Sequence, residues 1–132
     1  MSEPVTTNAF RRKLAAAFAA STGSGAAPLA PITHIAFGDG GYNPDTMTAL
    51  PPDPDAEALN HELLRKPLAV ITQEDEFSVT GTGVVAENEL VGYAISEAAL
   101  IDSDGLIVGF KNFAPKFKES NEEYETHIKL RF

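Results

Sequence analysis

The 132-residue sequence contains no cysteine. A chain without thiols forms no disulfide, builds no thiolate metal site and has no cysteine nucleophile. Long hydrophobic runs are also missing, because no apolar stretch approaches the roughly 20 residues that cross a bilayer. We therefore predict no membrane partner.

Positive charge is scarce, with 10 basic against 19 acidic residues and a net charge of −9. Such a chain repels phosphate backbones, so nucleic acid is not predicted as a partner. Three of the basic residues, Arg11, Arg12 and Lys13, stand together near the N-terminus. With 43% hydrophobic and 22% charged residues, the rest of the composition is typical of one globular domain.

Motifs for catalysis or metal binding are incomplete. Gly38–Gly41 lacks the Gly-Lys-Ser/Thr ending of a phosphate loop, and His61-Glu62 is followed by Arg65 where a zinc helix needs its second histidine. Asp102–Gly105 begins like a calcium loop, but the later ligands are missing. We therefore predict no metal, no cofactor and no enzymatic activity.

The central feature is a predicted hairpin over 91–114, in which two apolar runs flank Asp104-Gly105. Asp-Gly favours a two-residue turn because both residues tolerate positive φ. Counting outward from this turn pairs Ile101 with Val108, Ala99 with Phe110, Glu97 with Asn112 and Ile95 with Ala114. Alternation then predicts one apolar face. Its members are Val91, Tyr93, Ile95, Ala99, Ile101, Val108 and Phe110.

Glu97 interrupts this face, and a carboxylate in a core must be paired or hydrogen-bonded. One interpretation is a structural carboxylate held by Asn112, Arg65 or Lys111. The alternative is a general base or metal ligand in a small ligand-binding or hydrolytic domain, in which Glu97, His34 and Asp39 converge near the glycine loop. We also predict structural roles for Gly38, Gly40, Asp104, Gly105 and Asn112.

The N-terminal segment is predicted to be a helix capped by Thr6, Thr7 or Asn8. Its thin apolar stripe consists of Phe10, Leu14 and Phe18. We assign 1–22 as a docking helix, 23–31 as a Gly/Ala/Ser/Pro linker and 32–132 as an antiparallel β-rich domain.

Within 32–132, apolar alternation predicts strands at 32–37, 68–73, 77–85 and 124–132. Gly81 and Gly83 share one strand face, which indicates a close-packed neighbour. Asp53-Pro54 is typical of a helix start, and a helix is predicted from there to the break at Pro67. The predicted fold class is α+β, with a largely antiparallel β-sheet or sandwich, an N-terminal helix and one short internal helix.

Four stretches together resemble a known family. They are I-T-H-I-A-F-G-D-G-G at 32–41, T-A-L at 48–50, N-H-E-L-L-R-K-P-L at 60–68 and V-G-Y-A-I-S-E-A-A-L-I-D-S-D-G-L-I-V-G at 91–109. Their order and spacing are similar to those of the N-terminal attachment domain of bacteriophage tail-collar fibre proteins.

The resemblance implies a non-enzymatic virion protein of a phage tail, assembled in the host cytoplasm, with other tail or baseplate proteins and tail fibres as partners. Such fibres are typically homotrimers, so a trimer is expected. The chain ends at Phe132, where long fibres continue, and we therefore expect an adaptor between fibre and baseplate or a short component of the fibre network. The expected interface residues are Phe10, Arg11, Arg12, Lys13, Leu14, Phe18 and Tyr42.

Overall fold

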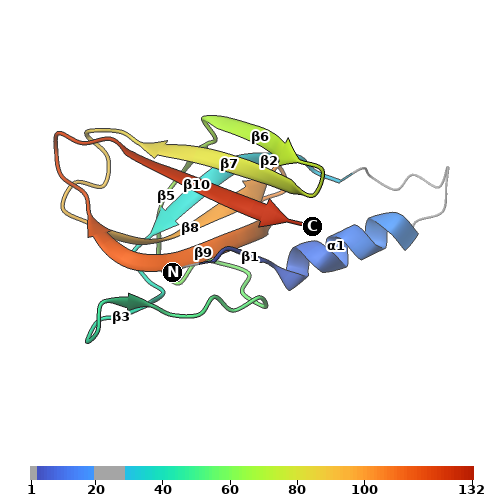
Figure 1. Cartoon of the computed structure of the whole chain (residues 1–132), viewed down its shortest axis with the longest axis horizontal. Coiled ribbons are helices and arrows are strands. Elements are labelled where there is room, and N and C mark those ends of the chain that lie inside the picture. The colour runs from blue at the N-terminus through green and yellow to red at the C-terminus, as the bar shows by residue number, and fades with distance from the viewer. Residues whose placement is uncertain (1–2, 20–28) are drawn as a thin grey trace.

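The computed structural model describes residues 3–19 and 29–132. Most of this part of the chain forms antiparallel β-sheets, and the helix α1 (Asn8–Ala19) lies near the N-terminus (Figure 1). The predicted antiparallel sheet and N-terminal helix are confirmed. The predicted linker at 23–31 falls largely outside the described residues. No helix in the described ranges is long and apolar enough to span a membrane.

The strands form two larger sheets and one small hairpin. The five-stranded sheet has the order β1-β9-β8-β2-β5, and the three-stranded sheet has the order β10-β7-β6. The first sheet contains β1 (Val5–Thr6), β9 (Ile107–Phe117), β8 (Ala94–Asp102), β2 (Ile32–Gly38) and β5 (Glu62–Pro67). The second contains β10 (Tyr124–Arg131), β7 (Ser78–Val85) and β6 (Val70–Asp75), and the hairpin consists of β3 (Tyr42–Asn43) and β4 (Thr48–Ala49).

The predicted central hairpin is β8–β9, and its register is partly as expected. Ala99 lies opposite Phe110 and Glu97 opposite Asn112, as counted from the sequence. The turn, however, has three residues and not two, because the amide of Asp102 donates to the carbonyl of Leu106 at 3.0 Å. A register shift between Leu100 and Ile101 absorbs the extra residue.

Register shifts also divide the predicted apolar face between two cores, since a one-residue slip moves side chains to the other face. Ile95 and Val108 belong to the larger cluster, which joins the two sheets, whereas Ala99 and Phe110 belong to a smaller cluster on the other side of β8. The expected burial of Val91 and Tyr93 is wrong, because both precede β8 and are about half exposed.

The two sheets approach closely at the glycines of β7. A Cβ atom built on Gly81 would lie 2.6 Å from Leu100, and one on Gly83 would lie 2.5 Å from Ile35. Only a residue without a side chain fits at these positions, so the expected close-packed neighbour is confirmed. From the three-stranded sheet, Val85, Ile128 and Leu130 complete the larger core.

The predicted internal helix between Asp53 and Pro67 is wrong, because this segment forms turns followed by β5. The Asp53 carboxylate accepts the amide of Asp55 at 2.9 Å, which closes a local turn and does not start a helix. Further along, β5 pairs with β2, where Leu64 lies opposite Phe37. Pairing along one whole edge of β2 outweighs the local helix preference of 56–65.

Candidate functional site

The Glu97 carboxylate is completely buried on β8 and is held by main-chain amides of two loops. Its Oε2 accepts hydrogen bonds from the amides of Gly40 at 3.0 Å and His61 at 2.8 Å. Its Oε1 accepts from the amide of Asn60 at 3.0 Å and from Asn60 Nδ2 at 3.2 Å. Four donors occupy the roughly four lone-pair positions of a carboxylate, so none remains for a substrate or a metal.

Glycines make this arrangement possible. A Cβ on Gly38 would lie 2.4 Å from both Glu97 Oε2 and the His61 carbonyl oxygen, and one on Gly40 would lie 2.5 Å from Asn60 Cβ. The loop therefore approaches Glu97 through backbone alone. As a result, one carboxylate joins the loop after β2 to the loop before β5.

The sequence-predicted partners of Glu97 are wrong. Asn112 lies opposite Glu97 in the register, but its Nδ2 donates to the carbonyl of Leu50 at 3.1 Å. Arg65 pairs with Glu62, and Lys111 donates to the main-chain carbonyl of His127. Burial lowers the pKa of Lys111 below the ordinary lysine value. The actual donors lie 36 to 57 residues away along the chain, where no local pattern identifies them.

The residues of the alternative catalytic set are not brought together. The His34 ring contacts Thr33, whereas Asp39 Oδ1 lies 2.5 Å from His61 Nδ1. On β2, Glu97 lies opposite Gly38, four residues from His34, which corresponds to roughly 13 Å of strand. Each residue has its own partners. Among the described residues, no group of three or more potential ligands is arranged to hold a metal ion.

Asn112 lines two cavities of about 450 and 160 Å³ beneath the Leu50–Pro51 segment. Its Oδ1 is buried and has no hydrogen-bond partner within residues 3–19 and 29–132. Neither cavity is lined by His34, Asp39 or Glu97. The space next to Asn112 is therefore separate from the alternative catalytic set.

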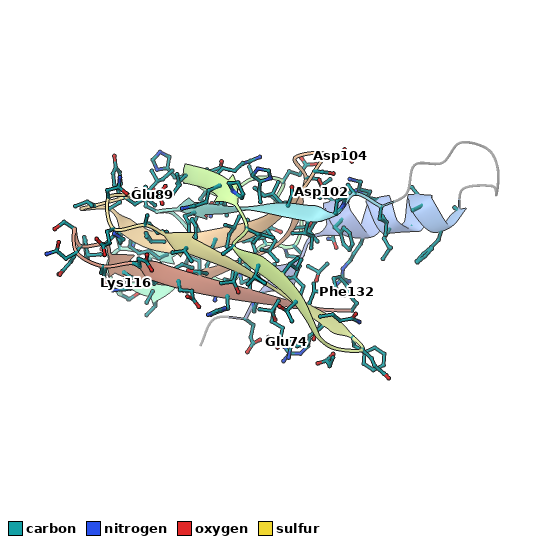
Figure 2. All side chains as sticks on the ribbon, turned by 90° about the horizontal axis from the view of Figure 1, so that it is seen from above. Glu74, Glu89, Asp102, Asp104, Lys116 and Phe132 are labelled. Atoms are coloured by element: carbon teal, nitrogen blue, oxygen red, sulfur yellow. The ribbon has the colours of Figure 1, made fainter. Side chains whose placement is uncertain are left out.

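The turn at Asp104-Gly105 fixes the middle of α1 to the sheet through Lys13. Asp102 is 2% exposed, and its Oδ1 accepts the amides of Asp104 at 2.9 Å and Leu106 at 3.0 Å. Its Oδ2 pairs with Lys13 Nζ at 2.7 Å, and Asp104 contacts the same ammonium at 2.8 Å. Figure 2 shows Asp102 and Asp104 beside α1. The hydrogen bond to Asp102 raises the pKa of Lys13. Gly105 takes a φ of +88°, as a turn glycine does.

The first residues of the chain join the five-stranded sheet. Val5 lies opposite Phe110 in the β1–β9 pair. Thr7 is fully buried, and its hydroxyl donates to the Ile107 carbonyl at 2.6 Å and accepts the Phe10 amide at 3.2 Å. Of the three predicted caps, Thr7 therefore caps α1. The helix is attached to the sheet at its first turn.

Beyond that turn, α1 projects away from the sheets (Figure 1). Phe10 packs against Phe132 with ring centroids 6.0 Å apart, Leu14 is half-buried and Phe18 is 79% exposed. The expected interface residues are thus divided. Arg11 and Arg12 are exposed beside this stripe, whereas Lys13 is bound within the chain. Tyr42 lies on β3, apart from α1 (Figure 1).

Two features, one beside α1 and one after β9, were not predicted from the sequence. Arg131 and Phe132 line a groove together with residues of α1. Lys118 is 2% exposed, and its ammonium donates to the carbonyls of Glu87 at 3.2 Å and Glu119 at 3.0 Å. The predicted strand at 124–132 ends one residue early, at Arg131 of β10, and Phe132 is 57% exposed, whereas Ile128 and Leu130 are buried.

The fold and the buried carboxylate define a β-rich structural domain in which a charged side chain organises loops. Comparison with protein families matches residues 1–130 to the phage tail-collar fibre protein, N-terminal, family. The chain therefore belongs to this family, as the resemblance indicated, and is a structural protein of a phage tail that interacts with other tail components. No curated protein and no solved structure matched the chain.

Proposed function

We propose that this protein is a non-enzymatic adaptor, or a short fibre-network component, that links tail fibres to the baseplate in the virion. The match of the family along 1–130 supports a tail role. All four hydrogen-bond acceptor positions of the Glu97 carboxylate are used, which supports a structural role over a catalytic one. A general base needs a free lone pair within reach of a proton.

The observation that carries this proposal is the outer half of α1, where Phe18 packs against no core cluster in the part of the chain that the structure describes. Phe18 is 79% exposed on a helix that projects from the body, and Ala15 and Ala19 beside it are exposed as well. Contiguous exposed apolar side chains of this kind are typical of a protein contact. In this proposal, Phe18 and Arg12, which is exposed on the same helix, contact another subunit or a baseplate protein, and the assembly is a homotrimer. The division into a docking helix (1–22), a linker (23–31) and a β-rich domain (32–132) is part of the same proposal.

Deletion of the whole N-terminal segment would be a poor test, since Val5 and Thr7 belong to the sheet and its loss would disturb the body. A single substitution at the exposed end of α1 avoids this problem. The matched control is Phe117, which is 60% exposed and lies at the end of β9, next to Lys116 and at the opposite end of the molecule from Phe132 (Figure 2).

The test compares Phe18→Asp with Phe117→Asp in the full-length chain. Light scattering counts subunits, co-purification with baseplate proteins measures docking, and thermal unfolding checks the fold. We expect Phe18→Asp to retain its unfolding temperature but to lose self-association or docking, and Phe117→Asp to behave as the wild type. Wild-type assembly by a folded Phe18→Asp protein would overturn the proposal.

A further inference from the structure

Three arginines stand out in this acidic protein because none has a carboxylate partner in the part of the chain that the structure describes. Among the described residues, no salt bridge is formed by Arg11, Arg12 or Arg131. Five other basic residues each form one, namely Lys13, Arg65, Lys66, Lys116 and Lys129. The remaining lysines, Lys111 and Lys118, donate to main-chain carbonyls. All 19 acidic residues lie within the described ranges, so no carboxylate side chain is hidden from this comparison.

Two of these arginines line the same apolar groove. It has a volume of about 310 Å³ and lies between α1 and the end of β10, and we call it the α1–β10 groove. Its lining residues are Thr6, Phe10, Arg11, Leu14, Arg131 and Phe132. Phe10 and Phe132 are in ring contact and form apolar lining, and Arg11 and Arg131 are exposed beside it.

The dimensions of the groove decide what kind of occupant it fits. A stable contact between two folded subunits takes about 20 to 30 residues from each side. Six lining residues are far fewer, so this groove fits a short segment with an apolar side chain and not the face of a second folded copy. Guanidinium groups bind carboxylates through paired hydrogen bonds, so the segment that complements Arg11 and Arg131 is acidic.

We propose that the α1–β10 groove binds a short acidic segment of another protein, with an aromatic or aliphatic anchor packed on Phe10 and Phe132 and carboxylates paired with Arg11 and Arg131. The proposal rests on the adaptor function, because it describes how a tail partner is held. It concerns the first part of the apolar stripe, where Phe10 and Leu14 line the groove, and not Phe18 at the exposed end of the stripe.

The experiment selects binders from a random-peptide library on the immobilised full-length protein and measures their affinity by fluorescence anisotropy. The expected consensus combines Asp or Glu with one large apolar residue. The double variant Arg11→Glu/Arg131→Glu should weaken the selected peptides by at least about tenfold, since two attractive contacts become repulsive. Its control is Arg65→Glu/Lys116→Glu, which changes the net charge equally, away from the groove, and should bind as the wild type.

A second variant, Phe132→Ala, tests the apolar anchor and should weaken peptide binding several-fold. The affinity of this variant should still fall with rising salt, because Arg11 and Arg131 are retained. Peptides without acidic residues, or equal affinity for wild type and Arg11→Glu/Arg131→Glu, would overturn the proposal. So would loss of self-association in this variant with no loss of peptide binding, because the groove would then serve a second copy. If the wild-type protein binds the selected peptides but the Phe18→Asp variant assembles normally, the adaptor function is refuted and the peptide-binding groove is not.

Discussion

The substitution Glu97→Gln tests the structural role of the buried carboxylate most directly. Glutamine keeps the shape of the side chain but turns one acceptor oxygen into an amide donor. Each glutamate oxygen accepts two hydrogen bonds, so either the two Asn60 donors or the amides of Gly40 and His61 lose their acceptor. The exposed Asn60 side chain can rotate and present its own oxygen, which makes the first orientation the less costly one.

A buried donor without an acceptor costs about 1–3 kcal/mol. With Asn60 relaxed, one main-chain donor is lost outright and the other contacts weaken, so we expect Glu97→Gln to lower the free energy of unfolding by about 2–4 kcal/mol. Such a loss is a large part of the roughly 5–15 kcal/mol that holds a domain folded.

Urea unfolding followed by far-UV circular dichroism measures this change. The control is Glu62→Gln, which removes the same charge from an exposed pair with Arg65 and should cost at most about 1 kcal/mol. Hydrogen exchange should also show lost amide protection in the loops around Gly40 and His61. If Glu97→Gln were no less stable than Glu62→Gln, or abolished a ligand-binding or hydrolytic activity at unchanged stability, the structural interpretation would be refuted.

Two further substitutions test the attachment of α1 and the contact between the sheets. Lys13→Gln should cost about 1–2 kcal/mol, because it leaves the buried Asp102 without its cation at a lysine that is partly open to solvent. Since the pKa of Lys13 is raised in the folded state, this difference should be constant from neutral pH up to the ordinary lysine value of 10.5 and should shrink as the pH rises through the raised pKa. A difference that persists at higher pH would exclude the ion pair as its cause. Gly83→Ala should cost about 1–3 kcal/mol, because its Cβ would meet Ile35 at 2.5 Å. The double variant Gly83→Ala/Ile35→Ala should be less destabilised in urea than the sum of the two single variants, and strict additivity would show that the sheets do not touch there.

The fold was predictable from the sequence where local pattern and long-range pairing agree. Alternation in 124–131 and the Asp-Gly turn identified β10 and the β8–β9 hairpin, including the pairing of Ala99 with Phe110. The extra turn residue could not be predicted, because the Asp102 carboxylate that accepts the amides of Asp104 and Leu106 is in turn bound by Lys13, 89 residues away. The helix before Pro67 was predicted wrongly because helix propensity is a local property, whereas the segment before Pro67 pairs with the edge of β2.

The candidate sites were also only partly predictable from the sequence. The sequence indicated that Glu97 would be buried and need partners, and that Gly38 and Gly40 belong to a tight approach, but not that these features meet. The unpaired state of Arg11 and Arg131 could not be predicted either, because it depends on which carboxylates the fold brings near each arginine.

The order of four motifs resembled the family, which the match over residues 1–130 shows. Periodicity, turn residues and composition predicted an antiparallel β-rich domain with an N-terminal helix. These properties arise from interactions between near neighbours in the chain. Three features depend on the tertiary structure. They are the hydrogen bonds of Glu97 to the loop amides, the division of the β8 side chains between two cores, and the α1–β10 groove. Each of them joins residues tens of positions apart, and the energy of such contacts depends on distances and burial that exist only after the chain has folded.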